Sequence, residues 1–189
     1  MRPRSFLAAL AVLSLVSLVG CNSSSPVEEP VKPPDQRKLL NACLLLTPEE
    51  ADEAAGHTVD ALASPLDVAI GVDTVKCSYG ELGPPLKLIS LEARRLPTTA
   101  RARSAYEGSE DTMRRLAVGK VETIDGLGEA AFWAGGQVQQ LHALRGDLVL
   151  LVAVELGDEA KRRQIAETIA RRALERIGEI EKRPAPPAS

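Results

Sequence analysis

The most regular hydrophobic pattern of the chain lies near its C-terminus. Ile165, Ile169, Ala173 and Ile177 follow one another at intervals of four residues, behind an acidic start at Glu159. This spacing places the apolar side chains on one face and predicts an amphipathic helix over residues 159–177 that packs on a sheet. Acidic residues interleave with the arginines of this helix, so the pattern favours a solvated polar face over a phosphate-binding one.

Alternating apolar and polar residues predict the strands of that sheet. Residues 73–79 and 86–93 both alternate, and Gly83-Pro84-Pro85 between them predicts an antiparallel hairpin. Residues 118–124 form a further candidate strand, and the glycine-rich stretch 126–133 is predicted to be a tight loop that leads into another strand. Because no Lys-Ser or Lys-Thr pair follows these glycines, they do not indicate a phosphate-binding loop.

A second hairpin is predicted by residues 137–144 and 148–155, which flank Arg145-Gly146-Asp147. Gly and Asp are residues that a tight turn requires, so this tripeptide favours a turn over integrin-type adhesion. The run 148–155 is the most apolar one of the mature chain and is predicted to be the central, most buried strand. His142 lies in the first strand and is interpreted as a structural histidine rather than a catalytic base.

Two further helices are predicted. Residues 47–56 combine an N-cap threonine, a proline at the first helical position and a final glycine, which predicts a short helix. Residues 98–116 carry a loose apolar stripe interrupted by Gly108, which predicts a surface helix or a broken pair. Residues 57–72 are predicted to form a long connection or a short helix around residues 66–70.

These elements together predict an α+β fold. The expected architecture is an antiparallel sheet of about five strands, backed by a short N-terminal helix, a middle helix and the long C-terminal amphipathic helix. A chain of 189 residues, 44% of them hydrophobic, suffices for one domain of this kind. We place the domain at residues 39–180, followed by a disordered, proline-rich tail at residues 181–189.

The N-terminus has the pattern of a secretory signal peptide over residues 1–20. Arg2 and Arg4 precede an apolar run that is too short for a membrane-spanning helix. The run ends in Leu18-Val19-Gly20-Cys21, which resembles the lipobox of bacterial lipoproteins, whose cysteine is acylated. A chance cysteine after an ordinary signal peptide is the alternative. The resemblance implies a lipid anchor at Cys21, which needs more than one acyl chain to be durable.

The stretch after the anchor, residues 21–38, is polar and rich in proline and serine. It cannot bury enough apolar surface to fold and is predicted to be a flexible tether between the lipid bilayer and the domain. We therefore expect the protein on the exported side of the cell envelope. Asn22 stands where lipoproteins retained at an inner membrane often carry Asp, so the outer membrane is expected in a host with two membranes.

Cys43 and Cys77 remain once Cys21 is assigned to the lipid. An even pair of cysteines in an exported chain is expected to be oxidised, so we predict a disulfide that joins the strand at Cys77 to the start of the first helix. The chain has no Cys-x-x-Cys spacing for redox exchange and no set of four zinc ligands, so a structural role is favoured.

Composition excludes one functional class. The formal net charge is -3 and the aromatic content is 3%, which supply neither the basic field nor the stacking surface that nucleic-acid binding needs.

The acidic residues near His57 match no metal-binding loop and are explained by the electrostatics of a helix N-terminus; they are Glu49, Glu50, Asp52 and Glu53. We predict no cofactor, no metal site and no nucleic-acid partner.

A wider resemblance rests on several short motifs. They are Ala42-Cys43-Leu44-Leu45-Leu46-Thr47-Pro48-Glu49-Glu50, Cys77-Ser78-Tyr79 and Gly126-Leu127-Gly128-Glu129-Ala130-Ala131-Phe132-Trp133, followed by the Gly-Asp hairpin and the last helix. This arrangement is similar to a family of exported bacterial lipoproteins that carry domain of unknown function 3558, over roughly residues 40–178. The resemblance implies a small α+β domain with one cysteine pair and no assigned catalytic residues.

Two functional classes remain. The favoured one is a non-enzymatic envelope module that binds a protein, lipid or small ligand through an exposed sheet face or a cleft beside the helices. The alternative is an envelope hydrolase or transferase, which the lack of Gly-x-Ser-x-Gly and His-Glu-x-x-His motifs disfavours. On aromatic position alone, Tyr79 and Trp133, together with residues 57–72, are the candidate ligand-binding residues.

Overall fold

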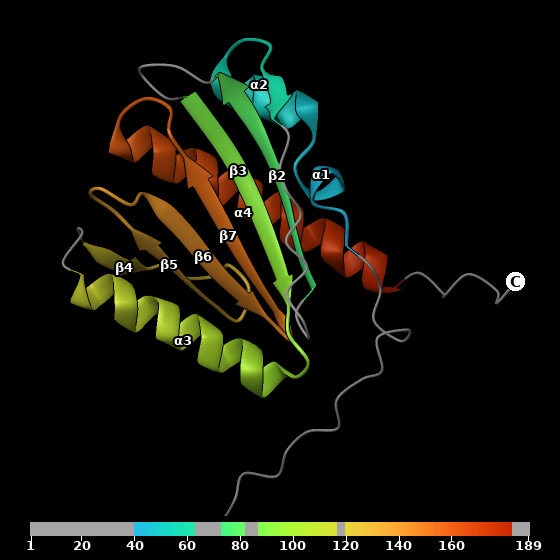
Figure 1. The fold of residues 1–189 in the computed structure, drawn as a ribbon, viewed down its shortest axis with the longest axis vertical. Helices are drawn as coiled ribbons and strands as arrows, with labels where there is room; N and C mark the ends of the chain where they lie inside the picture. The colour runs from blue at the N-terminus through green and yellow to red at the C-terminus, as the bar shows by residue number, and fades with distance from the viewer. Residues whose placement is uncertain (1–39, 63–72, 82–86, 117–119, 183–189) are drawn as a thin grey trace, which may run out of the picture.

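One antiparallel sheet runs through the molecule. The computed structural model describes residues 40–62, 73–81, 87–116 and 120–182. Within them the sheet has seven strands in the order β1-β2-β3-β7-β6-β5-β4 (Figure 1). The strands are β1 (Asp60–Leu62), β2 (Asp73–Glu81), β3 (Lys87–Arg95), β4 (Val121–Thr123), β5 (Ala130–Ala134), β6 (Gln140–Arg145) and β7 (Leu148–Val154). The helices are α1 (Ala42–Leu45), α2 (Pro48–Ala55), α3 (Thr99–Arg115) and α4 (Glu159–Lys182).

The predicted α+β class is confirmed, but the sheet is wider than the expected five strands. The edge strand β1 lies in residues 57–72, where a connection or a short helix was predicted. Its three residues are too few to show an alternating pattern. The helix suggested around residues 66–70 falls outside the described residues. Both predicted hairpins, β2–β3 and β6–β7, are antiparallel pairs as expected.

Strand β7 lies at the centre of the sheet, as its sequence predicted. Its side chains alternate between two apolar layers: Leu150 and Val152 join the core under α4, and Val149 joins the core under α3. Because helices cover both of its faces, β7 is apolar at every position rather than at every second one.

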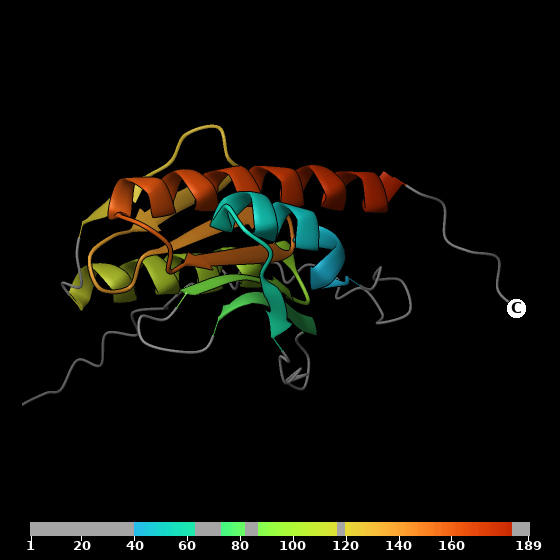
Figure 2. The same ribbon diagram turned by 90° about the horizontal axis from the view of Figure 1, so that it is seen from above.

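The helices divide between the two faces of the sheet. Figure 2 shows α4, α1 and α2 on one side and α3 on the other. The larger core lies under α4, whose buried residues Ala166, Ile169, Ala173 and Ile177 include most of the predicted stripe. The smaller core lies under α3 and centres on Phe132.

Helix α3 is continuous rather than broken. Gly108 is exposed, and a side chain at that position would meet nothing within 4 Å, so the glycine weakens the helix without bending it. Thr98 caps the start by accepting a hydrogen bond from the Arg101 amide at 3.2 Å. The prediction of a surface helix is thus confirmed in its unbroken form.

Helix α2 begins and ends where the sequence predicted. Thr47 and Glu50 form a reciprocal capping box, with the Thr47 amide donating to Glu50 Oε2 at 3.1 Å and the Glu50 amide donating to Thr47 Oγ1 at 3.4 Å. Gly56 closes the helix with φ of 79°, a left-handed conformation that glycine adopts without strain.

A disulfide joins Cys43 of α1 to Cys77 of β2, with 5.1 Å between the two Cα atoms. The predicted pairing of helix to sheet is therefore found. The predicted signal peptide (1–20), the acylated Cys21 and the tether (21–38) lie outside the described residues, as does most of the predicted tail. Among the described helices, none is long and apolar enough to cross a membrane.

Candidate functional site

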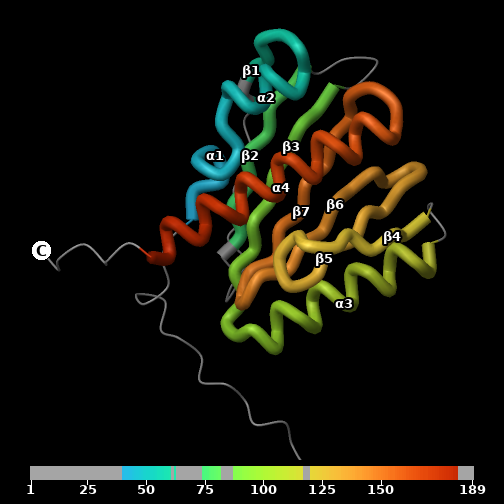
Figure 3. Tube along the Cα trace, turned by 180° about the vertical axis from the view of Figure 1, so that it is seen from behind, coloured from blue at the N-terminus to red at the C-terminus, as the bar shows by residue number. Residues whose placement is uncertain are grey.

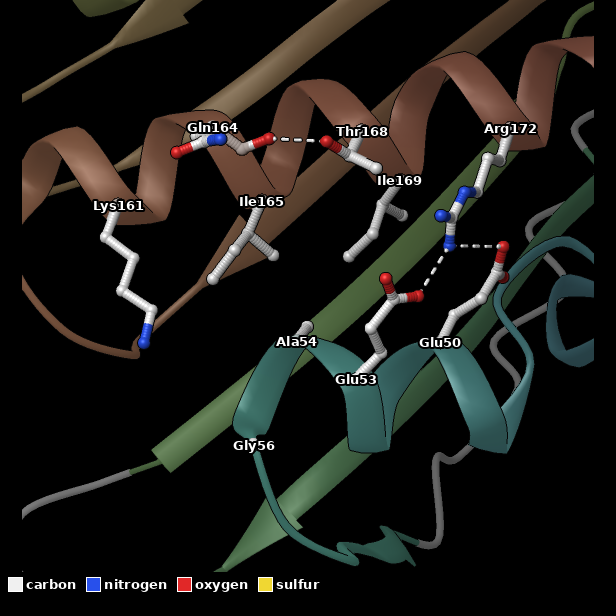
Figure 4. Close-up of a pocket in the computed structure, with 10 residues that line it drawn as sticks. All are labelled: Glu50, Glu53, Ala54, Gly56, Lys161, Gln164, Ile165, Thr168, Ile169 and Arg172. Atoms are coloured by element: carbon white, nitrogen blue, oxygen red, sulfur yellow. Dashed lines mark hydrogen bonds and ion pairs between the residues drawn. The ribbon is translucent and has the colours of Figure 1, made fainter.

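A groove of about 290 Å³ runs between helices α2 and α4. Figure 3 shows α2 lying beside α4 on one face of the sheet. In Figure 4, Ile165 and Ile169 point from α4 towards Ala54 on α2, so the middle of the groove is apolar. One end is lined by Glu50, Glu53, Thr168 and Arg172. The other end is lined by Lys161 and Gln164, together with Gly56. A groove of this size lies at the lower limit for small-ligand sites.

One end of the groove is closed by an ion-pair cluster. Arg172 donates to Glu50 at 3.4 Å and to Glu53 at 3.1 Å, so its charge bridges the two helices (Figure 4). Arg176 makes two further bonds of 2.7 Å to the Glu50 carboxylate and one of 2.8 Å to the carbonyl of Leu45. Each cation at this end is thus already paired with protein oxygens.

Glu50 is the centre of that cluster and is only 8% exposed. Burial by itself would raise its pKa, but the hydrogen bonds from Arg176 and the Thr47 amide, together with the charges of Arg176 and Arg172, hold the pKa below its ordinary value. Glu50 is therefore ionised at neutral pH and fixes α2 against α4.

The α2 wall is also fixed from the sheet side. Asp52 Oδ1 accepts a hydrogen bond from the Val59 amide at 2.8 Å, and the Tyr79 hydroxyl donates to the carbonyl of Leu46 at 3.3 Å. Ala51 is fully buried, and the Cys43–Cys77 disulfide holds the preceding helix to β2. These contacts all lie within the protein, so the fold itself holds the α2 wall of the groove in place.

The other end of the groove carries Lys161. Its ammonium has no ion-pair or hydrogen-bond partner among the residues that the structure describes. The aliphatic part of the side chain packs on Gly157, where an added Cβ would lie 2.9 Å from Lys161 Cδ. Gln164, one turn further along the helix, also lines the groove, but its side-chain amide does not point towards the Lys161 ammonium (Figure 4).

The polar face of α4 differs from the solvated surface that the sequence predicted. Arg162 pairs with Glu155 at 2.8 Å, and Arg163 pairs with Glu122 at 2.6 Å. Arg171 donates to the carbonyl of Gly126 at 3.2 Å. Arg163 and Arg171 therefore tie α4 to segments more than 40 residues away in sequence, which no pattern along the helix itself could reveal.

A second cavity of about 460 Å³ lies beside the β6–β7 turn. Its charged groups hold the fold together: Arg145 donates to the carbonyl of Leu174, and Glu129 Oε1 accepts from the Gly146 amide at 2.6 Å. Asp147 pairs with the buried Arg95 at 3.5 Å. Both charged residues of Arg145-Gly146-Asp147 are thus engaged within the domain, in agreement with the turn interpretation.

Tyr79 and Trp133, the two candidate ligand-binding residues, are core residues. They are 3% and 2% exposed, and neither lines the groove or the second cavity. These two aromatic side chains are therefore part of the hydrophobic core and do not form a binding surface. The groove itself was missed because it depends on the spacing between α2 and α4, which are separated by more than a hundred residues in sequence.

The two histidines lie in very different surroundings, and neither lines the groove. His142 is 3% exposed and stacks on Phe132, with 4.5 Å between the ring centroids. Burial lowers its pKa to about 4, which agrees with the interpretation of a structural histidine. His57 Nε2 lies 3.0 Å from Glu81 Oε1 at the surface. Within the described residues no group of three or more His, Cys, Asp or Glu could hold a metal ion.

Comparisons with known proteins add little to this geometry. No family model matches the chain, and no curated protein is similar to it. The resemblance to the lipoproteins with domain of unknown function 3558 therefore stays a prediction. Among solved structures, the extracellular domain of PknH from Mycobacterium tuberculosis is similar with a TM-score of 0.47 and 13% identity, over 75% of this chain and 98% of that chain. A likeness this weak says nothing about function.

Proposed function

We propose that this protein is a lipid-anchored, non-enzymatic binding module of a bacterial cell envelope, and that its ligand site is the groove between α2 and α4. The observation that carries the binding role is the groove with its apolar middle, whose two helical walls are held together by ion pairs and by the neighbouring disulfide. The anchor follows from the lipobox-like sequence that ends at Cys21.

Three features support a binding role over catalysis. Ile165 and Ile169 present an apolar surface to the groove, and the charged groups at its closed end are neutralised by one another. His142 is buried in the opposite core, and Cys43 and Cys77 are joined to each other. The buried histidine and the two cysteines are therefore unavailable as base or nucleophile in the groove.

The anchor is tested by the intact mass of the protein extracted from membranes of its host. We expect a mature chain that begins at Cys21 and carries two or more acyl chains, since one chain gives only marginal membrane residence. A Cys21→Ser variant should be released into the soluble envelope fraction. An unmodified mature chain with a different N-terminus would contradict the proposed anchor.

The groove is tested by nuclear magnetic resonance with a library of small organic fragments. We expect the fragments that bind to shift the amide signals of Ala54, Ile165 and Ile169. Thr168 lies exposed in the groove wall, so Thr168→Trp should fill the groove and abolish these shifts. Glu179→Trp, at an exposed position of the same helix outside the groove, is the matched control and should leave them unchanged. Fragment binding that survives Thr168→Trp would contradict the proposed site.

A further inference from the structure

Among the residues that the structure describes, the groove has one cation without a carboxylate partner, Lys161, and it lies next to an apolar strip. From this we infer that the ligand is a small amphiphilic carboxylate, with its carboxylate on Lys161 and its aliphatic chain along Ile165 and Ile169. This inference rests on the proposed function and names the class of ligand for the same groove.

The charge argument comes from a comparison along α4. Arg162, Arg163 and Arg172 each pair with carboxylates of the protein, at distances between 2.6 and 3.4 Å. Lys161 belongs to the same helix but pairs with no carboxylate among the described residues. An anionic ligand would therefore give Lys161 the ion pair that the arginines already form within the protein.

The donors at this end of the groove match a carboxylate. The Lys161 ammonium offers three N–H donors to a carboxylate at this end of the groove. Gly157 leaves room for the Lys161 stem, which lies over it and carries the ammonium to the end of the groove away from Arg172 (Figure 4). One carboxylate can be bound there by the ammonium of Lys161.

The apolar strip fixes the orientation and length of the ligand. With a rise of about 1.5 Å per residue, Ile165 and Ile169 lie about 6 and 12 Å from Lys161 along the helix axis. Ala54 faces them from α2 (Figure 4). At the far end, Glu50 and Glu53 already neutralise Arg172, so a second anion would gain nothing there. The ligand is therefore anionic at one end only.

Octanoate and octylammonium are the probes that test this inference, because they share an alkyl chain and differ in charge. Both are titrated at pH 7 and low salt into the mature Cys21→Ser chain, which cannot be acylated. We expect octanoate to shift the amide signals of Ala54, Ile165 and Ile169, and octylammonium to bind more weakly. Raising the salt concentration should weaken octanoate binding, because the ion pair at Lys161 is exposed to solvent.

Three variants sharpen the test. Lys161→Gln should weaken octanoate binding up to about fivefold, the effect of one exposed ion pair. Lys161→Glu should reverse the preference, so that octylammonium binds better than octanoate. Lys182→Gln, an exposed lysine of the same helix outside the groove, is the control and should change neither affinity.

Three outcomes would overturn the inference. If octylammonium binds the wild-type chain as tightly as octanoate, or if Lys161→Glu does not reverse the preference, the charge of Lys161 does not select the ligand. If neither probe shifts the groove signals while uncharged fragments do, the ligand class is wrong but the groove remains a binding site. If the fragments also fail, the proposed function fails with it.

Discussion

The two faces of the sheet hold their helices by different means. On one face, α1 and α2 are secured by the Cys43–Cys77 disulfide and by the ion pairs of Glu50. On the other face, α3 is secured by aromatic packing, with Tyr106 edge-on to Phe132 at 5.4 Å and Phe132 stacked on His142 at 4.5 Å. Yet both faces share the central strand β7.

Helix length explains this difference. Helices α1 and α2 have four and eight residues, too few to be stable by themselves or to bury much apolar area. Helix α3 has 17 residues and packs an apolar stripe on the sheet. Helices α1 and α2 are short, and a groove separates α2 from α4. Covalent and ionic links therefore contribute to holding them in place. On the face with the groove, α4 packs on the larger apolar core, and the disulfide and the ion pairs add the links that hold α1 and α2.

Loss of the disulfide is the largest change that we expect. Cys43 and Cys77 are 34 residues apart, so replacing both with Ser should lower the free energy of unfolding by about 3–4 kcal/mol. Urea unfolding measures this loss, and hydrogen exchange should rise in α1 and α2 but not in α3. Reducing agent should destabilise the wild-type chain equally and leave the double variant unchanged. Equal loss of protection in α3 would show that the two faces are not independent.

His142 should make the α3 face sensitive to mild acid. Its pKa in the folded chain is about 4, below the ordinary value of 6.5, so the unfolded chain takes up the proton first as pH falls. The free energy of unfolding should therefore drop by about 3 kcal/mol from pH 6.5 to pH 4, with no contribution above that window. His142→Phe keeps an aromatic ring on Phe132 and should remove this part of the slope. An unchanged slope in urea unfolding would contradict the buried neutral histidine.

Glu50 should give a smaller effect, on the α4 face and in a lower pH window. Glu50→Gln should lower the free energy of unfolding at pH 7 by about 2 kcal/mol, since Arg176 loses its charged partner but keeps some contact with water. Because the pKa of Glu50 is lowered in the folded chain, this contribution is full above its ordinary pKa of 4.5 and disappears as pH falls through the lowered value. The variant and the wild type should therefore converge in acid.

The smallest effect is expected from an exposed ion pair of α3. Arg115 and Asp111 lie 2.8 Å apart with most of both side chains in solvent, so Asp111→Asn should change the free energy of unfolding by no more than about 0.5 kcal/mol. Both variants are measured by the same urea titration. The difference between their losses of unfolding free energy shows how much of the effect of Glu50→Gln comes from burial of the ion pair rather than from the short distance between the charges. A loss equal to that of Glu50→Gln would show that burial is not the deciding factor.

Local signals in the sequence predicted most of the fold. The capping residues of α2, the hairpin turns beside β7 and the apolar stripe of α4 each lie within a few residues of one another, so their physics is readable along the chain. The edge strand β1 was not readable, because its formation depends on pairing with β2 across an intervening stretch. The candidate site was predicted less well than the fold, since Tyr79 and Trp133 turned out to be core residues.

What the sequence determined by itself was the class of the fold, the cysteine pairing and the two ends of α2, since each depends on local chemistry or on a count of residues. The tertiary structure alone decided where the groove lies and which charges remain unpaired in it. Lys161 and Arg172 are both basic residues in one helical pattern. Among the described residues, the approach of α2 gives Arg172 two carboxylate partners and gives Lys161 none. The role of a charged side chain depends on its neighbours in space, because a side chain that is already paired within the protein is not free to bind a ligand.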